Sequence, residues 1–529
     1  MKRTFNLADL FEIVVDTVPD RLALVSGSVR HTYRDLEART NRLAQALQAR
    51  GLKAGDHVGL QLYNGHQYFE SMLALLKIRC VPININYRYV TEELAYLYDN
   101  ADLKGLFFEA ELSGQVHPAL SAAPACHLLI HGGEGDPGGI DASSYESVLA
   151  EGSPERDFGP RSGQDLWIIY TGGTTGMPRG VMWEHENLLF AGLQGGRPGD
   201  DPLETPEQLS EFILQGAPFT MHTAAPLIHG SAQFSSFIGM FTGGKSVLVP
   251  GASFIPEETA RLLGDEGVTT VNLVGDAMGR PLAETFLTGD YKAPELFVVS
   301  SAGAVLSETV KQRLGEAFPD AMIMNNFGSS EAGHAGLAIT DAGGQPKFFM
   351  LPGRTKILSE DGRECAVGEQ GKIAHCGHLP LGYYKDEEKT AATFKLIDGI
   401  RYVLPGDAGI LEEDGTVTLL GRGSVCINTG GEKVFPEEVE EGLKAHEAIF
   451  DAVVVGLADD RWGQRVTALV QLRDSMHISE EDVIAHARSK VAGYKCPKQV
   501  FFVERVPRHA TGKPDYKTAQ RRAGELAGE

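Results

Sequence analysis

The sequence predicts an α/β fold with a large N-terminal domain of parallel-type sheets covered by helices, and a small α+β domain at the C-terminus. Strand-like and helix-like segments alternate over the first 130 residues and again from about residue 246, a pattern typical of parallel sheets covered by helices. After about residue 420 the pattern becomes a smaller mixture of strands and helices. With 529 residues the chain also exceeds the usual size of a single core. We therefore predict domains over residues 1–422 and 423–529.

The individual elements of the large domain follow from hydrophobic periodicity. A helix is predicted over 35–52 because Leu36, Leu43 and Leu47 fall on one helical face. The next predicted elements are a strand at 58–63, a helix at 68–78 and a strand at 81–85. Later elements are strands at 246–249, 270–274 and 296–300, with a helix at 256–264. Residues 193–210, rich in Gly, Pro and Asp, are predicted to form an exposed loop.

The small domain is predicted to begin with a helix at 436–445. Pro436 suits the first helical position, and the glutamates that follow it suit the first turn. The remaining predicted elements are strands at 451–457, 466–472 and 500–504, with a helix at 480–491.

Charge and composition exclude several classes of protein. The formal net charge is -23, from 48 basic and 71 acidic residues, and there is no basic stripe, so we expect no nucleic-acid partner. No apolar stretch approaches the roughly 20 residues of a membrane span, so no transmembrane segment is expected. Six scattered cysteines without a Cys-x-x-Cys pair suit a reducing cytoplasm. The cluster from His375 to His378 matches no standard zinc spacing and favours a structural role.

A run rich in glycine and threonine lies between two apolar segments at residues 170–180. Without bulky side chains, such a loop can turn its backbone N–H groups and hydroxyls toward a polyanion, and Arg179 adds positive charge. No Gly-x4-Gly-Lys-Ser/Thr motif occurs, so this is not a Walker loop. Taken alone, the run also fits a surface turn. The residues of this candidate phosphate cradle are Thr171, Gly172, Gly173, Thr174, Thr175, Gly176 and Arg179.

Four further motifs could serve the same chemistry, and each has a plain structural alternative. The segment from Asn325 to Glu331 combines an aromatic ring, a glycine, hydroxyls and a carboxylate that suits Mg²⁺, but it could be a simple strand-to-turn segment. Asp407 and Arg422 could serve a ribose or belong to hairpin turns. The pair Gly430 and Gly431 runs directly into a helix start, and Lys513 lies between Gly512 and Pro514 on a tight turn or a solvated loop.

In this order, the motifs are far more specific than any one of them alone. The chain resembles the adenylate-forming superfamily of acyl-CoA synthetases, peptide-synthetase adenylation domains and beetle luciferases, from the segment Thr32 to Leu36 as far as Lys513. The resemblance implies a large N-terminal domain with several subdomains, including a small β-barrel-like part, and a mobile C-terminal lid. It also implies ATP, Mg²⁺ and CoA as ligands, and a carboxylic acid as the small-molecule substrate.

The resemblance assigns a role to each motif. Thr171 to Arg179 would bind the ATP phosphates, Ser330 would lie beside the α-phosphate, and Glu331 would bind magnesium. Lys513 would be needed for adenylation, and His229 would border the acyl and thiol tunnels. The adenine-binding walls would be Ser301, Ala302, Gly303, Asn325, Asn326, Phe327 and Gly328; Asp407 and Arg422 would serve the ribose; and Gly430 and Gly431 would line the pantetheine channel.

Three positions depart from the usual family pattern. Arg179 stands where lysine is usual, Gly173 where serine is usual, and Ser424 at a hinge position that commonly carries aspartate or lysine. Arginine keeps the charge but binds phosphate through a planar fork, so the kinetics of nucleotide binding are expected to differ. None of the three removes a residue on which the chemistry depends.

The implied reaction activates a carboxylate as an acyl-adenylate and transfers the acyl group to a thiol. CoA is the expected acceptor because no carrier domain follows Lys513. The alternatives are an enzyme that loads a carrier protein, an aryl-acid CoA ligase and, least favoured, a non-enzymatic nucleotide-binding relative. The resemblance is to actinobacterial fatty-acid and steroid side-chain CoA ligases, which implies a lipophilic acid; both a monomer and a homodimer stay open. The candidate acyl-pocket walls are His229, Gln233, Phe234, Val274, Gly275, 302–305, Gly328 and 332–334.

Overall fold

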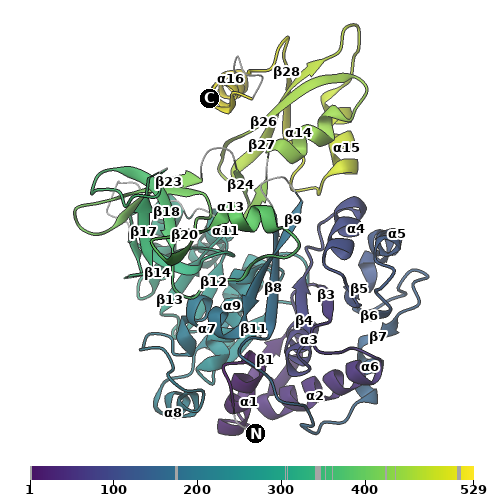
Figure 1. The fold of residues 1–529 in the computed structure, drawn as a ribbon, viewed down its shortest axis with the longest axis vertical. Helices are drawn as coiled ribbons and strands as arrows, with labels where there is room; N and C mark the ends of the chain where they lie inside the picture. The colour runs from purple at the N-terminus through teal and green to yellow at the C-terminus, as the bar shows by residue number, and fades with distance from the viewer. Residues whose placement is uncertain are drawn as a thin grey trace.

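The fold is known from a computed structural model, in which three sheets carry the helices of the chain (Figure 1). The described residues are 3–172, 177–303, 306, 308–339, 347–351, 353–359, 361–422, 426–434, 436–508 and 514–528.

The longest sheet begins as a parallel sheet with helices between its strands. The strands β1, β11, β10, β12, β13 and β14 are parallel neighbours in that order, and β2 is antiparallel to β1 at the edge. These strands are β1 (Leu22–Ser26), β2 (Val29–Thr32), β10 (Thr220–Thr223), β11 (Lys245–Leu248), β12 (Thr270–Leu273), β13 (Val298–Ser301) and β14 (Met322–Ser329). The accompanying helices are α9 (Gly230–Phe241), α10 (Pro256–Asp265), α11 (Gly275–Thr288) and α12 (Glu308–Ala317).

Beyond β14 the same sheet continues with antiparallel strands. They enclose small cores of their own, one of which contains Ile357, Ile373 and Val417. This segment corresponds to the small β-rich part that the family resemblance implies. Its strands are β15 (Gly333–Ile339), β16 (Lys347–Met350), β17 (Thr355–Leu358), β18 (Gln370–His375), β20 (Phe394–Ile397), β21 (Ile400–Val403), β22 (Asp407–Leu411) and β23 (Val417–Arg422).

The second sheet is parallel from β8 through β4, β3, β5 and β6 to β7; β9 pairs antiparallel with β8, and β19 pairs antiparallel with β9. Trp167 on β8 and Trp183 on β9 are fully buried and join its core. Its strands are β3 (His57–Gln61), β4 (Val81–Asn84), β5 (Gly105–Glu109), β6 (Leu128–Gly132), β7 (Ser143–Ser144), β8 (Leu166–Gly172), β9 (Pro178–Glu184) and β19 (Gly382–Tyr383). The helices of this part are α1 (Leu7–Thr17), α2 (Tyr33–Ala49), α3 (His66–Lys77), α4 (Thr91–Asn100), α5 (Ser113–Ala119), α6 (Tyr145–Glu151), α7 (His185–Gly192), α8 (Gln208–Gln215) and α13 (Glu387–Thr393).

The third sheet and its helices form what we call the C-terminal unit, the described residues from 426 to 528. It lies at one end of the molecule, in yellow-green and yellow in Figure 1, and has a core that contains Val454, Val466 and Val483. Ala492, in contrast, packs into the core beneath the second sheet. Its elements are β24 (Ile427–Thr429), β25 (Glu432–Val434), β26 (Ile449–Asp459), β27 (Gly463–Leu472), β28 (Gln499–Phe502), α14 (Pro436–Lys444), α15 (Glu480–Lys490) and α16 (Tyr516–Ala527).

The predicted fold class is confirmed, and the predicted helices and strands are found within a few residues of their expected bounds. The prediction of an exposed loop over 193–210 is wrong in part, because Gly195, Gly196 and Leu203 are buried and α8 begins at Gln208. The domain boundary stays a prediction, since residues 423–425 lie outside the described residues. Among the described helices, none combines the length and apolar character needed to cross a bilayer.

Candidate active site

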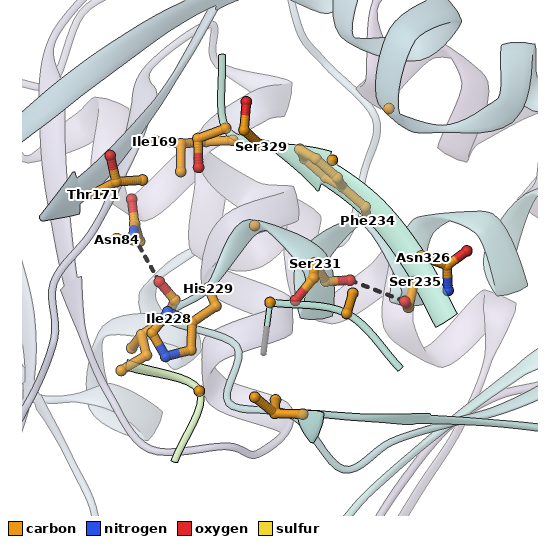
Figure 2. Close-up of a pocket in the computed structure, with 18 of the residues that line it drawn as sticks. Asn84, Ile169, Thr171, Ile228, His229, Ser231, Phe234, Ser235, Asn326 and Ser329 are labelled. Atoms are coloured by element: carbon orange, nitrogen blue, oxygen red, sulfur yellow. Dashed lines mark hydrogen bonds between the residues drawn. The ribbon is translucent and has the colours of Figure 1, made fainter. Parts of the chain in front are cut away.

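A cavity of about 280 Å³ lies where the carboxyl ends of strands from both large sheets meet the C-terminal unit. Residue Asn84 ends β4, Thr171 lies near the end of β8, and Asn326 and Ser329 lie on β14. This is the edge at which parallel α/β sheets usually bind ligands. Figure 2 shows Asn84 and Thr171 on one side of the cavity, with Ser231, Ser235 and Asn326 farther along it. Side chains from segments far apart in sequence therefore line the cavity.

The glycine- and threonine-rich run connects two antiparallel strands at the cavity. Thr171 pairs with Arg179 and Gly172 with Pro178 across the β8–β9 hairpin, and Thr171 lines the cavity. Of the five residues between Gly172 and Pro178, the four residues Gly173, Thr174, Thr175 and Gly176 lie outside the described residues. The guanidinium of Arg179 donates to the carboxylate of Asp386 over 2.8 Å. Its positive charge thus has a protein partner before any phosphate binds.

The segment after β13 and the end of β14 place several predicted nucleotide-binding residues together. Ala302, Gly303, Asn326, Phe327 and Gly328 all line the cavity. The side-chain amide of Asn326 donates to the hydroxyl of Ser300 over 2.7 Å and to the carbonyl of Ser301 over 3.2 Å. A Cβ at position 328 would lie 2.3 Å from the carbonyl oxygen of Gly333, so glycine is required there.

The candidate magnesium ligand Glu331 also lines the cavity, next to Ser330. The hydroxyl of Tyr383 donates to Glu331 Oε1 over 2.9 Å, and the indole of Trp183 donates to the backbone carbonyl of Ser330 over 2.8 Å. Burial, and then the charge of Glu331, raise the pKa of Tyr383, so its hydroxyl keeps its proton and acts as a donor. One carboxylate with free coordination capacity, beside a site for phosphates, fits the way Mg²⁺ is usually bound.

Some predicted nucleotide-binding residues are not among the described residues that line the cavity. Asp407 and Arg422 pair directly across β22 and β23, and the side chain of Arg422 is outside the described part of the structure. The hydroxyl of Ser301 accepts the backbone N–H of Gly275 over 2.9 Å, which positions the start of α11. Asn325, Ser301 and Asp407 are described, and they do not line the cavity. Their nucleotide roles stay predictions.

The acyl-pocket prediction is largely matched by the lining of the cavity. Residues His229, Phe234, Val274 and His334 line it, joined by Gly333 and Ala302. His229 is the N-cap residue of α9, and Figure 2 shows Ser231 and Ser235 one turn apart on this helix, joined by a 2.9 Å hydrogen bond from the Ser235 hydroxyl to the Ser231 carbonyl. Gln233, Gly275 and Ala332 are described but do not line the cavity, and residues 304 and 305 lie outside the described residues. The amide of Gln233 is buried and donates to the Tyr68 hydroxyl and to the carbonyl of Leu227.

The C-terminal unit contributes residues to the same cavity. Gly431, Glu432, Lys433 and Tyr494 line it. The carboxylate of Glu432 accepts from His229 Nε2 over 3.2 Å and from the guanidinium of Arg88 over 2.7 Å. Burial alone would raise the pKa of Glu432, but His229 and Arg88 together hold it at about 2. Glu432 is therefore ionised, and it joins the C-terminal unit to both large sheets.

The glycine pair of the C-terminal unit lies in close contacts that exclude side chains. Both glycines have positive φ, 58° at Gly430 and 85° at Gly431. A Cβ at Gly430 would lie 2.6 Å from the Trp462 ring, and a Cβ at Gly431 would lie 2.0 Å from Val274 Cγ1. Gly431 lines the first cavity, and Gly430 and Trp462 line a second cavity of about 620 Å³.

Residues of positive and of negative charge line the second cavity. Three arginines, Arg88, Arg280 and Arg461, line it together with the acids Glu284 and Asp460. Arg461 also lies over the Trp462 ring, 4.5 Å from its centroid. Three arginines in a cavity beside the glycine pair suit a ligand that has an anionic part.

Lys513 itself lies outside the described residues, but the residues beside it are placed. Arg508 pairs with Asp451 of β26 over 2.7 Å, and Pro514 forms a β-bridge with Arg508. Asp515 caps α16 by accepting the N–H of Thr518. These contacts are internal to the C-terminal unit, and the described flanking residues line neither cavity.

Several lining residues were not found by sequence reasoning. Asn84 holds the carbonyls of Tyr170 and Ile228 through its amide, and Gln194 comes from the segment predicted as an exposed loop. Arg88, Glu432 and Tyr494 also join the site only through the fold. The sequence could have indicated Glu432, because this residue directly follows the predicted glycine pair. Arg88 lies 344 residues before Glu432, and no local pattern marks Arg88 as a site residue.

Comparison with known proteins agrees with this geometry. The model of the AMP-binding enzyme family matches residues 11–384, and that of the AMP-binding enzyme C-terminal domain matches residues 438–513. The chain is 42% identical to a 3-oxocholest-4-en-26-oate–CoA ligase of Rhodococcus rhodochrous, over 98% of this chain and 96% of that one. It is 41% identical to a medium/long-chain-fatty-acid–CoA/3-oxocholest-4-en-26-oate–CoA ligase of Mycolicibacterium smegmatis, over 97% of this chain and 96% of that one.

Solved structures share the fold at lower sequence identity. The amide bond synthetase McbA of Marinactinospora thermotolerans superposes with a TM-score of 0.81 at 22% identity, covering 97% of this chain and 99% of that one. A long-chain-fatty-acid–CoA ligase of Archaeoglobus fulgidus superposes with a TM-score of 0.73 at 21% identity, covering 95% and 98%. The site geometry, the two matched family models and these full-length relatives lead to one conclusion: the chain is a member of the adenylate-forming, AMP-binding enzyme family.

Proposed function

We propose that this enzyme is an AMP-forming acyl-CoA synthetase for a lipophilic carboxylic acid. The observation that carries the proposal is the position of Gly431 and Glu432 of the C-terminal unit, which meet His229 at a cavity already lined by Thr171, Ser330 and other candidate ATP-binding residues. The candidate ATP-binding residues, the candidate acyl pocket and the glycine pair beside the second cavity thus lie at one place.

In the first step, a carboxylate oxygen of the acid attacks the α-phosphorus of ATP and pyrophosphate leaves. Thr171 and Ser330 would hold the phosphates, and a magnesium ion bound by Glu331 would neutralise part of their charge. Lys513 would stabilise the charge that moves between the carboxylate and the α-phosphate. Such reactions depend mainly on positioning and electrostatics, since the protein supplies no covalent intermediate.

In the second step, the thiolate of CoA attacks the carbonyl carbon of the adenylate, and AMP leaves with the electron pair of the broken C–O bond. The pantetheine arm would pass Gly430 and Gly431, where side chains would block it. The phosphates of CoA would lie at the second cavity, near Arg280 and Arg461. His229, held through Nε2 by Glu432, would border the thiol and the reacting carbonyl.

The chemistry of the acyl pocket supports a lipophilic acid. Ile169, Phe234, Ile238 and Val274 give the cavity an apolar wall. Burial, followed by the charge of Arg354, lowers the pKa of His334, so this wall residue is neutral near pH 7. The relatives at about 40% identity are named for medium- and long-chain fatty acids and for a steroid side-chain acid. We therefore propose the same substrate classes here, with aryl acids as the alternative.

A panel of acids tests the proposal. With Mg²⁺-ATP and CoA, the purified enzyme is expected to form AMP and acyl-CoA from octanoate, palmitate and a steroid side-chain acid. The expected kcat/KM for these acids exceeds that for acetate and benzoate by about 100-fold or more, because an apolar pocket gains affinity with each buried methylene. The measurement is chromatographic detection of both products for each acid.

Two outcomes would contradict the proposal. Formation of acyl-adenylate without acyl-CoA from every acid would exclude CoA as the acceptor, and an assay with acyl carrier protein would then identify the carrier-loading alternative. A kcat/KM for benzoate above that of every aliphatic acid would support the aryl-acid alternative.

A further inference from the structure

The boundary between the C-terminal unit and α4 contains a buried ammonium group. Lys495 follows α15, and its side chain is only 2% exposed. Its Nζ lies 2.5 Å from Glu93 Oε1 on α4 and 2.7 Å from Glu438 Oε1 on α14. Glu93 and Glu438 belong to different parts of the molecule, so one lysine joins the large N-terminal part to the C-terminal unit.

The carboxylate that receives Lys495 from the N-terminal part is held in place independently of the lysine. Glu93 lies in the first turn of α4, and its second oxygen accepts the backbone N–H of Val90 over 3.0 Å. The Tyr89 ring, from the same segment, lies 5.2 Å from Lys495 Nζ, and the Tyr494 ring lies 5.7 Å away. Because Glu93 is already held by Val90 and the two aromatic rings are close by, binding the Lys495 ammonium group costs little conformational entropy of the Glu93 side chain.

Glu93 of the N-terminal part adds a second carboxylate to the Lys495–Glu438 ion pair, which lies within the C-terminal unit. Burial acts to lower the pKa of Lys495, but Glu93 and Glu438 raise it by more, so the lysine is charged. Burial raises the pKa of Glu438 to about 7, with Lys495 acting against the rise. Removing one member of a buried ion pair leaves its partner buried without compensation, which is costlier than removing a surface pair.

The cluster is connected directly to the residues that reach the active site. Tyr494, which lines the cavity, is the neighbour of Lys495 in sequence. On the other side, Glu438 lies in the first turn of α14, which begins two residues after β25, the strand that carries Glu432. Moving Lys495 away from Glu93 would therefore displace both segments by which the C-terminal unit reaches the cavity.

We propose that Lys495 is a positioning residue for the thioester-forming step: by joining Glu93 to Glu438, it holds Gly431, Glu432 and Tyr494 at the cavity. The inference rests on the proposed function, because it needs two half-reactions that use the C-terminal unit differently. Adenylate formation would use Lys513, and its described neighbours Arg508 and Asp515 contact Asp451 and Thr518 of the C-terminal unit. The Glu93–Lys495 contact belongs to the arrangement in which Gly431 lines the cavity.

The two half-reactions can be measured separately in the full-length enzyme. Pyrophosphate release from ATP and an accepted acid reports adenylation, and single-turnover acyl-CoA formation from supplied acyl-adenylate and CoA reports thioesterification. For Lys495→Ala and for Glu93→Gln, adenylation is expected to stay within about twofold of wild type, while thioesterification falls by about tenfold or more. Lys495→Arg is expected to recover part of the loss, because it keeps the charge.

The same boundary offers a matched control. Lys490 pairs with Glu92, the residue before Glu93, but across 3.8 Å and in contact with solvent. Lys490→Ala also removes one lysine from an ion pair between the two parts, and it is expected to leave both half-reactions within about twofold, as an exposed pair should.

Several results would overturn the proposal. Unchanged thioesterification in both Lys495→Ala and Glu93→Gln would remove the positioning role, and so would an equal fall in both half-reactions, which would indicate general destabilisation. An equal effect of Lys490→Ala would show that any charge at this boundary matters. Failure of the wild-type enzyme to form acyl-CoA would instead contradict the proposed function, so the two failures are distinguishable.

Discussion

Replacing Lys513 by alanine is expected to abolish adenylate formation while leaving thioesterification of a supplied acyl-adenylate close to the wild-type rate. The proposed role of the ammonium group is to stabilise charge between the carboxylate and the α-phosphate, a need that ends once pyrophosphate has left. Removing one preorganised charge from a transition state costs about 100-fold or more in rate. Pyrophosphate release and single-turnover acyl-CoA formation measure the two steps.

The control for Lys513→Ala is Lys517→Ala, which removes a nearby exposed lysine on α16. It is expected to change neither rate by more than about twofold. If Lys513→Ala releases pyrophosphate at the wild-type rate, the lysine has no role in adenylation. If it loses both half-reactions equally, its role is not confined to the first step.

Replacing Gly431 by alanine is expected to have the opposite effect, with adenylation retained and thioesterification lost. The new Cβ would lie 2.0 Å from Cγ1 of Val274, which is 6% exposed, so one of the two residues would have to shift. The φ of 85° adds backbone strain that glycine avoids. Overpacking of this kind costs about 1–3 kcal/mol, which corresponds to a fall of roughly fivefold to 150-fold in thioesterification.

A second glycine of the C-terminal unit serves as the control for Gly431→Ala. Gly493 has no atom within 4 Å of the position its Cβ would take, and it lies next to Tyr494, which also lines the cavity. Gly493→Ala is expected to leave thioesterification within about twofold of wild type. Wild-type thioesterification by Gly431→Ala would mean that the passage beside Val274 is not the route of the thiol.

Local sequence predicted most elements because their causes are local. Helix α2 is an example, since Leu36, Leu43 and Leu47 are spaced for one buried face and the Thr32–Asp35 capping box sets its start. Pro436 likewise opens α14 in the predicted place. The segment 193–210 was harder, because Gly195 and Gly196 are buried by contacts with Pro202 and Leu203 rather than by any periodic pattern.

Some residues of the candidate site could likewise be predicted from the sequence, and others could not. His229, Ser330 and Glu331 line the cavity, and the family resemblance of short motifs had assigned all three to the site. Arg88, Glu93 and Lys495 carry no such motif, and the sequence did not identify them. They acquire their surroundings only when segments separated by more than 300 residues meet.

The sequence by itself determined the α/β class, the order of the motifs and therefore the family, because hydrophobic period and short motifs act over a few residues. Only the tertiary structure decided how the C-terminal unit meets the large sheets. It pairs Arg179 with Asp386, sets Glu432 between His229 and Arg88, and buries Lys495 between two carboxylates. The physical reason is that ion pairing and burial depend on distance in space, and the chain specifies that distance only through the packing of the whole fold.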